Sequence, residues 1–386
     1  MKIIFVAPRY HTNQHFWVRA LQQHGHDVRF LVDKKVEFAE HYDLLQPTKV
    51  QTKKLPRFIC FIIDSFMRIQ GKQIRERLHT FPQWSFLKTH LVEDTPDVVI
   101  VRDTGSMLSV VTFIMCRLHK IPCILYNQHP LEDREHRLTR WLQAIGVAPK
   151  VRITPMRKNV SHTHNAKQNS FYVPLISEFT YDASSRPAPA PPIKLLFIGK
   201  FTMERKKHML LLESVRSLSH KYSVELTMVG AYHESNIKPY QDAVAFVHDH
   251  KLQDKVTLLQ NVPYTEMPAL YQAHDLFVLP SVDEPFAISP LEAMNFGLPV
   301  IITDSNGARG CVRDGVTGFV VPSDDQDALT EKISLLLADT ALLQTMGSNA
   351  HKHVLEQHNN ESFLLHLYRA LNAADVQIPA STSVLK

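Results

Sequence analysis

Residues 280–294 read PSVDEPFAISPLEAM, and this stretch decides which fold the chain is expected to adopt. The apolar run directly before it, residues 276–279, predicts a short buried strand. Ser289, Pro290 and Glu292 have the pattern of the N-cap, N1 and N3 positions of a following helix. The stretch is therefore a loop from the carboxyl end of a strand to a helix, which is where parallel α/β sheets bind ligands.

Two carboxylates lie in this stretch, Glu284 in the loop and Glu292 in the first helical turn. Backbone N–H groups at a helix start point into the same crevice, which suits the diphosphate of a nucleotide. Glu292 has a local alternative, because a capping box also places a glutamate at N3. A purely local role explains Glu284 less well, since it stands between a strand end and a proline. Glu284 is thus the stronger candidate for ligand contact.

Short apolar strands alternate with longer amphipathic segments on both sides of this loop. Such alternation predicts parallel sheets with right-handed crossovers. In the second half the predicted strands are 193–198, 224–229, 256–259, 276–279 and 300–303, with helices at 209–218, 290–296 and 328–337. In the first half they are strands 2–6, 98–101 and 123–126, with a helix at 107–119.

A proline-rich stretch, residues 184–192, divides the chain and predicts a semi-rigid linker. We therefore expect a first domain over 1–183, a second over 193–360, and a C-terminal helix and tail over 361–386. The net charge of +5 splits unevenly, +11 in residues 1–192 and −6 in the remainder. This asymmetry indicates that the two halves meet different partners.

Composition excludes several classes of protein. With 12 glycines in 386 residues and none before Gly25, an N-terminal dinucleotide fingerprint is absent. No apolar run approaches the ~18 residues of a transmembrane span, and residues 1–7 are too short for a signal-peptide core. The four cysteines have no CxxC spacing. We expect a soluble, cytoplasmic protein.

The stretch 280–301, with Gly307, residues 314–320 and the upstream segments 256–262 and 267–278, resembles the nucleotide-sugar signature of retaining GT-B glycosyltransferases of family four. The resemblance covers most of residues 194–350. It implies a GT-B fold, two doubly wound Rossmann-like domains that face a central cleft. It also implies a donor domain in the second half and an acceptor domain in the first.

Carried over by position, the resemblance assigns a role to each glutamate. Glu284 would contact the donor sugar or support charge at its anomeric carbon, and Glu292 would bind the ribose hydroxyls. The loop residues Phe286, Ala287 and Ile288 would lie in the same donor site.

A second candidate site follows the first strand of the second half, at residues 199–208, GKFTMERKKH. Gly199 ends the strand, and a cluster of cations precedes the next helix. Cations at such a loop neutralise a departing nucleoside diphosphate. In the family an arginine follows the glycine and a lysine comes several residues later. Lys200 stands at the arginine position and Lys206 matches the lysine best, with Arg205 or Lys207 one residue away; the alternative is a solvated basic turn.

The first half offers His129, which follows the strand 123–126. Family members often have a histidine here that faces the sugar, so His129 is the candidate catalytic residue of this domain; a surface or core role is the alternative. After the first strand, the loop 8–13 lacks the glycines that most relatives have. Arg9, His11 and Asn13 are candidates to replace that backbone contact by side chain.

No required metal or cofactor is predicted, and the nucleoside-diphosphate sugar is a co-substrate. The sequence Asp325-Gln326-Asp327 has the letters of a metal-binding DxD motif, but it lies at a predicted helix start and fits a capping role better.

The basic first half predicts an anionic acceptor, a lipid-linked phosphate or a charged polysaccharide. Residues 53–77 combine seven cations with an aromatic and aliphatic run, which predicts a peripheral contact with an anionic membrane. An ordinary core helix with a basic end is the alternative. No nucleic-acid module is recognisable, so nucleic acid is not an expected partner.

The leading hypothesis is a retaining glycosyltransferase that acts in cell-surface polysaccharide, lipopolysaccharide or glycolipid synthesis, in the cytoplasm or at the inner face of the plasma membrane. The alternative is a catalytically silent nucleotide-sugar-binding subunit, motivated by the missing glycines and by Lys200 in place of arginine. A sugar phosphorylase or epimerase is a weaker third hypothesis. The base, sugar and acceptor depend on variable loops and are not predicted.

Overall fold

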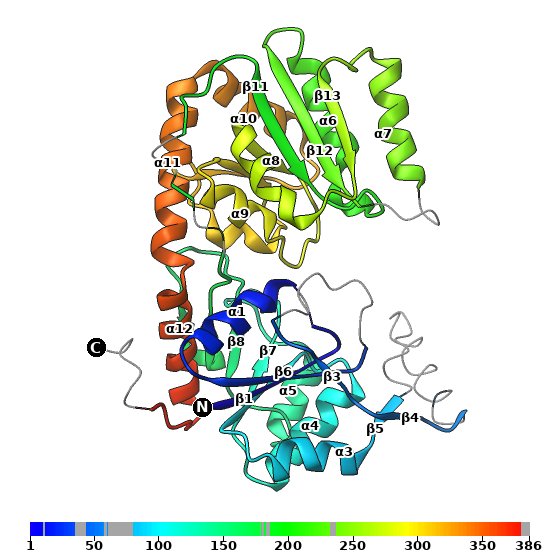
Figure 1. Cartoon of the computed structure of the whole chain (residues 1–386), viewed down its shortest axis with the longest axis vertical. Coiled ribbons are helices and arrows are strands. Elements are labelled where there is room, and N and C mark those ends of the chain that lie inside the picture. Colours follow the sequence, from blue (N-terminus) through cyan, green and yellow to red (C-terminus); the bar gives the residue numbers. More distant parts are fainter. Residues whose placement is uncertain are drawn as a thin grey trace. The chain divides into compact units, whose positions relative to one another are not determined.

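Two parallel sheets organise the chain, one in each of two units (Figure 1). The computed structural model describes residues 1–10, 12–34, 44–57, 60, 80–177, 179, 181–182, 186–231 and 237–379. The first unit comprises Met1–Pro155, Thr163–Ile176 and Asn360–Lys386, and the second comprises Met156–His162 and Ser177–Asn359.

The sheet of the first unit has the strand order β3-β2-β1-β6-β7-β8-β10-β9. Its strands pair in parallel except for β10 with β9. The strands are β1 (Lys2–Ala7), β2 (Asp27–Val32), β3 (Thr48–Lys49), β6 (Val98–Arg102), β7 (Cys123–Tyr126), β8 (Arg152–Thr154), β9 (His164–Asn165) and β10 (Ser170–Tyr172), with a separate antiparallel pair β4 (Thr52–Lys54) and β5 (Thr80–Pro82). The helices are α1 (Thr12–Gln23), α3 (Trp84–Lys88), α4 (Met107–Leu118), α5 (Arg137–Ala144) and α12 (Asn360–Ala373), with a π-helical turn η2 (Thr89–Glu93).

The sheet of the second unit is entirely parallel, in the order β13-β12-β11-β14-β15-β16. Its strands are β11 (Ile193–Ile198), β12 (Val224–Gly230), β13 (Val256–Gln260), β14 (Leu276–Leu279), β15 (Val300–Thr303) and β16 (Gly318–Val321). Its helices are α6 (His208–Leu218), α7 (Lys238–Asp249), α8 (Met267–Ala273), α9 (Ser289–Asn295), α10 (Gln326–Ala338) and α11 (Thr340–Gln357), with 3₁₀ turns η5 (Glu204–Lys206), η7 (Tyr264–Glu266) and η8 (Gly307–Cys311).

The strand order of the second sheet reverses between β11 and β14. From β11 the chain builds outward to β12 and β13, and from β14 it builds the other way to β15 and β16. The four residues of β14 are completely buried, as expected for a central parallel strand covered on both faces. Such a reversal opens a crevice at the carboxyl ends of the two central strands. The two candidate loops, 199–207 and 280–288, both begin there.

The structure confirms the predicted strands and helices, several of them to the residue. The predicted cap of the helix at 290–296 is wrong. Ile288, with φ −79° and ψ −28°, is the N-cap of α9, so Ser289 already lies inside the helix and caps nothing. Glu292 hydrogen-bonds to two tyrosines of other elements instead of forming a capping box. Gly297 ends the helix as predicted, in the left-handed region with φ +76°.

The two units divide the chain at positions other than the predicted domain boundaries. Helix α12 belongs to the first unit, where Phe363 stacks on Trp17 with ring centroids 5.4 Å apart. Residues 156–162 belong to the second unit, where Arg157 Nε donates to the carbonyl of Gly310 at 3.1 Å. Contacts between residues far apart in the sequence thus decide which unit each segment joins, and no local sequence pattern predicts such contacts.

Among the helices that the structure describes, none combines the length and the apolarity that a membrane span requires.

A buried histidine gives the first unit a pH-dependent stability. His26 Nε2 and the hydroxyl of Tyr368 lie 2.7 Å apart, and burial lowers the pKa of His26 to about 4. An unfolded histidine takes up a proton near pH 6.5. The unfolded state therefore binds more protons between these values, and the free energy of unfolding falls as the pH drops from about 6.5 towards 4.

We predict that His26→Gln removes this contribution. The difference in unfolding free energy between wild type and variant should be up to about 2 kcal/mol larger at pH 7.5 than at pH 5, measured by urea denaturation. His248→Gln is the matched control, because the side chain of His248 is 80% exposed. An equal difference at both pH values would contradict the assignment.

Candidate active site

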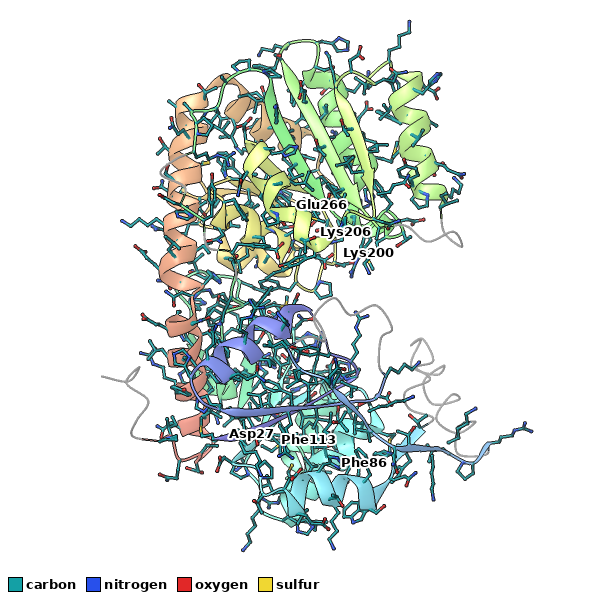
Figure 2. The ribbon with its side chains drawn as sticks, in the orientation of Figure 1. Asp27, Phe86, Phe113, Lys200, Lys206 and Glu266 are labelled. Carbon is teal, nitrogen blue, oxygen red and sulfur yellow. The ribbon has the colours of Figure 1, made fainter. Side chains whose placement is uncertain are left out.

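The loop after β11 forms one wall of the candidate site. Gly199 follows the strand, and η5 then turns the chain into α6. A Cβ on Gly199 would lie 3.1 Å from Cδ of Lys206 and 2.9 Å from the ring of Phe197, so glycine lets the lysine chain cross the strand end. Figure 2 shows Lys200 and Lys206 close to each other at this end of the second sheet.

A buried ion pair joins this loop to the loop after β14. Lys206 Nζ lies 2.9 Å from Oε2 of Glu284, and both side chains are more than nine-tenths buried. Burial lowers the pKa of Lys206, while the charge of Glu284 opposes that shift. The structure therefore brings together two residues that the sequence placed in separate motifs, 78 positions apart in the chain.

The neighbouring cations occupy distinct positions. A guanidinium nitrogen of Arg205 lies 3.5 Å from the same Glu284 oxygen, with the side chain 36% exposed. Lys207 instead pairs with Asp324 at 2.6 Å. Lys200 is exposed, and its charge also lowers the pKa of Lys206, after burial and Arg205. Arg205 and Lys206 thus flank one carboxylate, and Lys200 lies near enough to Lys206 to affect its pKa, which leaves an excess of positive charge.

The loop 280–288 is fixed by contacts to the segment after β15. The amide of Gly307 donates to the carbonyl of Glu284 at 2.8 Å. A Cβ on Gly307 would lie 1.8 Å from the carbonyl oxygen of Pro285, so no side chain fits at this close approach. Asn306 Nδ2 also donates to Ser281 Oγ at 3.1 Å. These contacts hold the Glu284 backbone in one position.

Beyond Pro285 the same loop presents free backbone donors. Within the described ranges the N–H groups of Phe286, Ala287 and Ile288 donate to no other group. Phe286 and Ala287 are buried, and Ile288 is partly exposed. A ligand oxygen is a suitable acceptor for such groups, since buried backbone N–H groups are seldom left unpaired.

Glu292 is held by two phenol groups. Tyr264 donates its hydroxyl to Oε1 at 2.9 Å, and Tyr271 donates to Oε2 at 2.7 Å. Tyr271 is completely buried, and burial together with the negative charge of Glu292 raises its pKa well above the usual value. The carboxylate is 3% exposed and has a fixed orientation that helix α9 alone would not give it.

In the first unit, His129 follows β7 and is exposed. Thr154 Oγ1 donates to its carbonyl at 2.7 Å, and its amide donates to Asn127 Oδ1 at 3.3 Å. A buried ion pair supports this turn. Arg152 is completely buried, and its guanidinium is 2.8 Å from Oε1 of Glu135. Asn127 Nδ2 donates to the same oxygen at 2.9 Å, so the network fixes the segment that carries His129.

The sequence analysis predicted neither the buried counter-charge of Arg152 nor the hydrogen-bond donors that hold Glu292. Arg152 gives a usable signal, because a cation inside the apolar run VRIT requires a buried counter-charge. Tyr264 and Tyr271 give none, since their hydroxyls reach Glu292 from η7 and α8 and no spacing rule connects these segments. Such contacts follow from packing between elements.

Two predicted contact segments lie partly outside the residues that the structure describes. The structure does not describe His11 of the loop 8–13 or most of the basic segment 53–77 (58, 59 and 61–77).

Across the ranges that are described, His, Cys, Asp and Glu form no group of three or more that could hold a metal ion. Asp325 caps α10, as predicted, by accepting from the amide of Ala328 at 2.9 Å.

Comparison with known proteins finds a family match within the second unit. Residues 181–353 match the family model described as glycosyl transferases group 1. The capsular polysaccharide biosynthesis glycosyltransferase CapM of Staphylococcus aureus is 29% identical over 41% of this chain and 40% of its own. The human alpha-1,3/1,6-mannosyltransferase ALG2 is 30% identical over 46% and 44%. The chain thus matches less than half of the length of these curated relatives.

Solved structures with a similar fold span the chain almost completely. A sucrose-phosphate synthase from Thermosynechococcus elongatus has a TM-score of 0.68 at 20% identity, covering 97% of this chain and all of its own. The Anabaena protein Alr3699/HepE, solved in complex with UDP, has a TM-score of 0.68 at 14% identity with the same coverage. The fold is GT-B, with two Rossmann-like parts built on parallel sheets, as the sequence predicted.

We predict that breaking the Arg152–Glu135 pair destabilises the first unit. Glu135→Leu should lower the free energy of unfolding by about 3–5 kcal/mol, because it leaves the guanidinium buried without a counter-charge. The double variant Glu135→Leu/Arg152→Met should lose less than the sum of the two single variants, measured by urea denaturation. Strictly additive losses would show that the two residues do not act as a pair.

Proposed function

We propose that the chain, whose residues 181–353 match the family model of glycosyl transferases group 1, transfers a sugar from a nucleoside-diphosphate donor to a hydroxyl acceptor, with retention of the anomeric configuration. The observation that carries the proposal is the Lys206–Glu284 pair at the reversal point of the second sheet. It joins a cation suited to the leaving group with a carboxylate suited to the sugar.

Lys206 is suited to the diphosphate. An ammonium group has three donors, and within the described part of the chain its one ion-pair partner is Glu284. It can therefore keep that carboxylate and also donate to a phosphate oxygen. Arg205, Lys200 and the free N–H groups after Pro285 add further donors for the charge that develops as the diphosphate leaves.

The two glutamates have separate roles in this proposal. Glu284 orients the donor sugar and supports positive charge at the anomeric carbon as the bond to the diphosphate breaks. Glu292 binds the ribose, with the two tyrosines fixing its orientation. The acceptor hydroxyl attacks on the side from which the diphosphate departs. Its oxygen bonds to the anomeric carbon as the bond to the diphosphate breaks, and its proton passes to the departing phosphate oxygen, so no second carboxylate nucleophile is required.

The acceptor site is proposed in the first unit. The excess positive charge of residues 1–192 favours an anionic acceptor, and His129 lies exposed on a rigid turn. The names of relatives in capsule and lipopolysaccharide core synthesis support a role in building a cell-surface glycan. We propose a cytoplasmic reaction, consistent with four free cysteine thiols.

We predict that Lys206→Met weakens nucleoside-diphosphate binding about tenfold or more, because one charge-assisted hydrogen bond contributes about 1.5–3 kcal/mol. Isothermal titration with UDP, GDP and ADP measures this and also identifies the base. The control is Lys207→Met, since Lys207 pairs with Asp324 and should change affinity less than twofold. Equal losses in both variants would contradict the role of Lys206.

Glu284→Gln separates binding from chemistry. This variant should bind the nucleoside diphosphate normally and lose at least about 100-fold in turnover, by analogy with the loss of one group that stabilises transition-state charge. Donor turnover is measured as release of nucleoside diphosphate. Normal turnover in the variant would overturn the role of Glu284, and donor binding without transfer or hydrolysis in the wild type would favour a silent binding subunit.

We predict that Tyr271→Phe reduces recognition of the ribose. Without its fixed hydroxyl partner, Glu292 should bind a ribonucleoside diphosphate about five- to tenfold more weakly, since a hydrogen bond to a charged group is lost. Affinity for the 2′,3′-dideoxy analogue should change little, which distinguishes ribose recognition from general damage. Tyr222→Phe, which loses a hydroxyl contact to Ser334 outside the site, is the control. Equal weakening for both nucleotides would contradict the assignment.

A further inference from the structure

Helix α5 presents an apolar stripe to solvent. Leu138, Trp141 and Ile145, three and four positions apart, are 44%, 58% and 52% exposed. The adjoining side of the helix is packed, with Thr139 and Leu142 buried and Leu142 in the core of the first unit. Large exposed apolar residues grouped on one helix face indicate an interaction surface.

The last turns of helix α4 also expose apolar side chains. Ile114 and Leu118 are 36% and 63% exposed. The turn after α5 approaches the last turn of α4, because a Cβ on Gly146 would lie 3.7 Å from a guanidinium nitrogen of Arg117. Figure 1 shows α4 and α5 labelled near each other in the first unit. We call Ile114, Leu118, Leu138, Trp141 and Ile145 the α4–α5 face.

Cations surround the α4–α5 face. They are Arg117, Lys120, Arg134, Arg137 and Arg140, all exposed. Within the described residues none of the five forms an ion pair. Residues 107–121 contain no acidic side chain, and in 134–150 the acidic side chain is Glu135, which is buried against Arg152. Glu132 and Asp133 directly precede Arg134, so the face combines apolar area with an excess of positive charge.

We propose that the α4–α5 face docks on an anionic lipid surface. A tryptophan with aliphatic neighbours suits the boundary between headgroups and acyl chains, and arginines beside it pair with lipid phosphates. A second copy of this chain fits poorly, because a symmetric contact would bring the five cations of each copy together. The proposal does not depend on the transfer reaction.

Vesicle sedimentation tests the surface. The full chain should pellet with phosphatidylglycerol/phosphatidylcholine vesicles at low salt, and less with pure phosphatidylcholine. Each cation near an anionic surface contributes about a fivefold factor in partitioning, so Arg137→Gln/Arg140→Gln should bind about 25-fold more weakly. Trp141→Ser should also lose binding. Leu355→Ser is the control, because Leu355 is 53% exposed on α11 of the second unit.

Lipid quenching locates the contact. In a Trp84→Phe background the remaining tryptophans are Trp17, which is 1% exposed, and Trp141. Brominated lipid in the anionic vesicles should quench the Trp141 fluorescence, and high salt should reverse the quenching.

Several results would overturn the proposal. They are a failure to pellet at low salt, binding that Leu355→Ser removes as effectively as Trp141→Ser, or pelleting without quenching. A dimer in light scattering that Trp141→Ser dissociates, together with no vesicle binding, would assign the face to a second copy instead.

Discussion

The ion pair between Lys206 and Glu284 is the constraint on which the candidate donor site depends. It connects the carboxyl ends of β11 and β14, the two strands between which the sheet order reverses. A single buried charge in this position would be costly, and each residue compensates the other. The pair thus fixes the spacing of two loops that carry the cations and the free amides.

Backbone features on both sides maintain this arrangement. Gly199 allows the lysine chain to pass over the strand end, and Gly307 allows the carbonyl of Pro285 to approach the next loop. The glycine cluster between 297 and 318 has two physical causes. A Cβ on Gly307, Gly310 or Gly318 would lie 1.8, 2.2 or 2.1 Å from a backbone oxygen, and Gly297 and Gly315 have φ of +76° and +73°. A glycine-poor chain retains glycine where this packing requires it.

The sequence predicted the strands, the helices and the donor-side candidates because these depend on local patterns. Apolar runs identify buried strands, and the glutamate motif and cation cluster follow the strand ends. It could not decide between Arg205, Lys206 and Lys207, because that choice depends on how η5 turns the three side chains. The tyrosines at Glu292 and the packing of α12 into the first unit are long-range contacts, and no local pattern contains them.

The Arg152–Glu135 and Lys206–Glu284 ion pairs differ in which donors remain available after pairing. All donors of Arg152 have partners: Glu135, Asn127 and Ser170, and the carbonyls of Pro130 and Leu131. Such a saturated group can hold a turn in place but has no donor for a ligand. Lys206, with Glu284 as its bonded partner among the described residues, keeps donors in reserve beside two further cations. Burial and charge are similar in the two pairs, and the unused donors of Lys206 are the feature that favours its proposed role in binding a ligand.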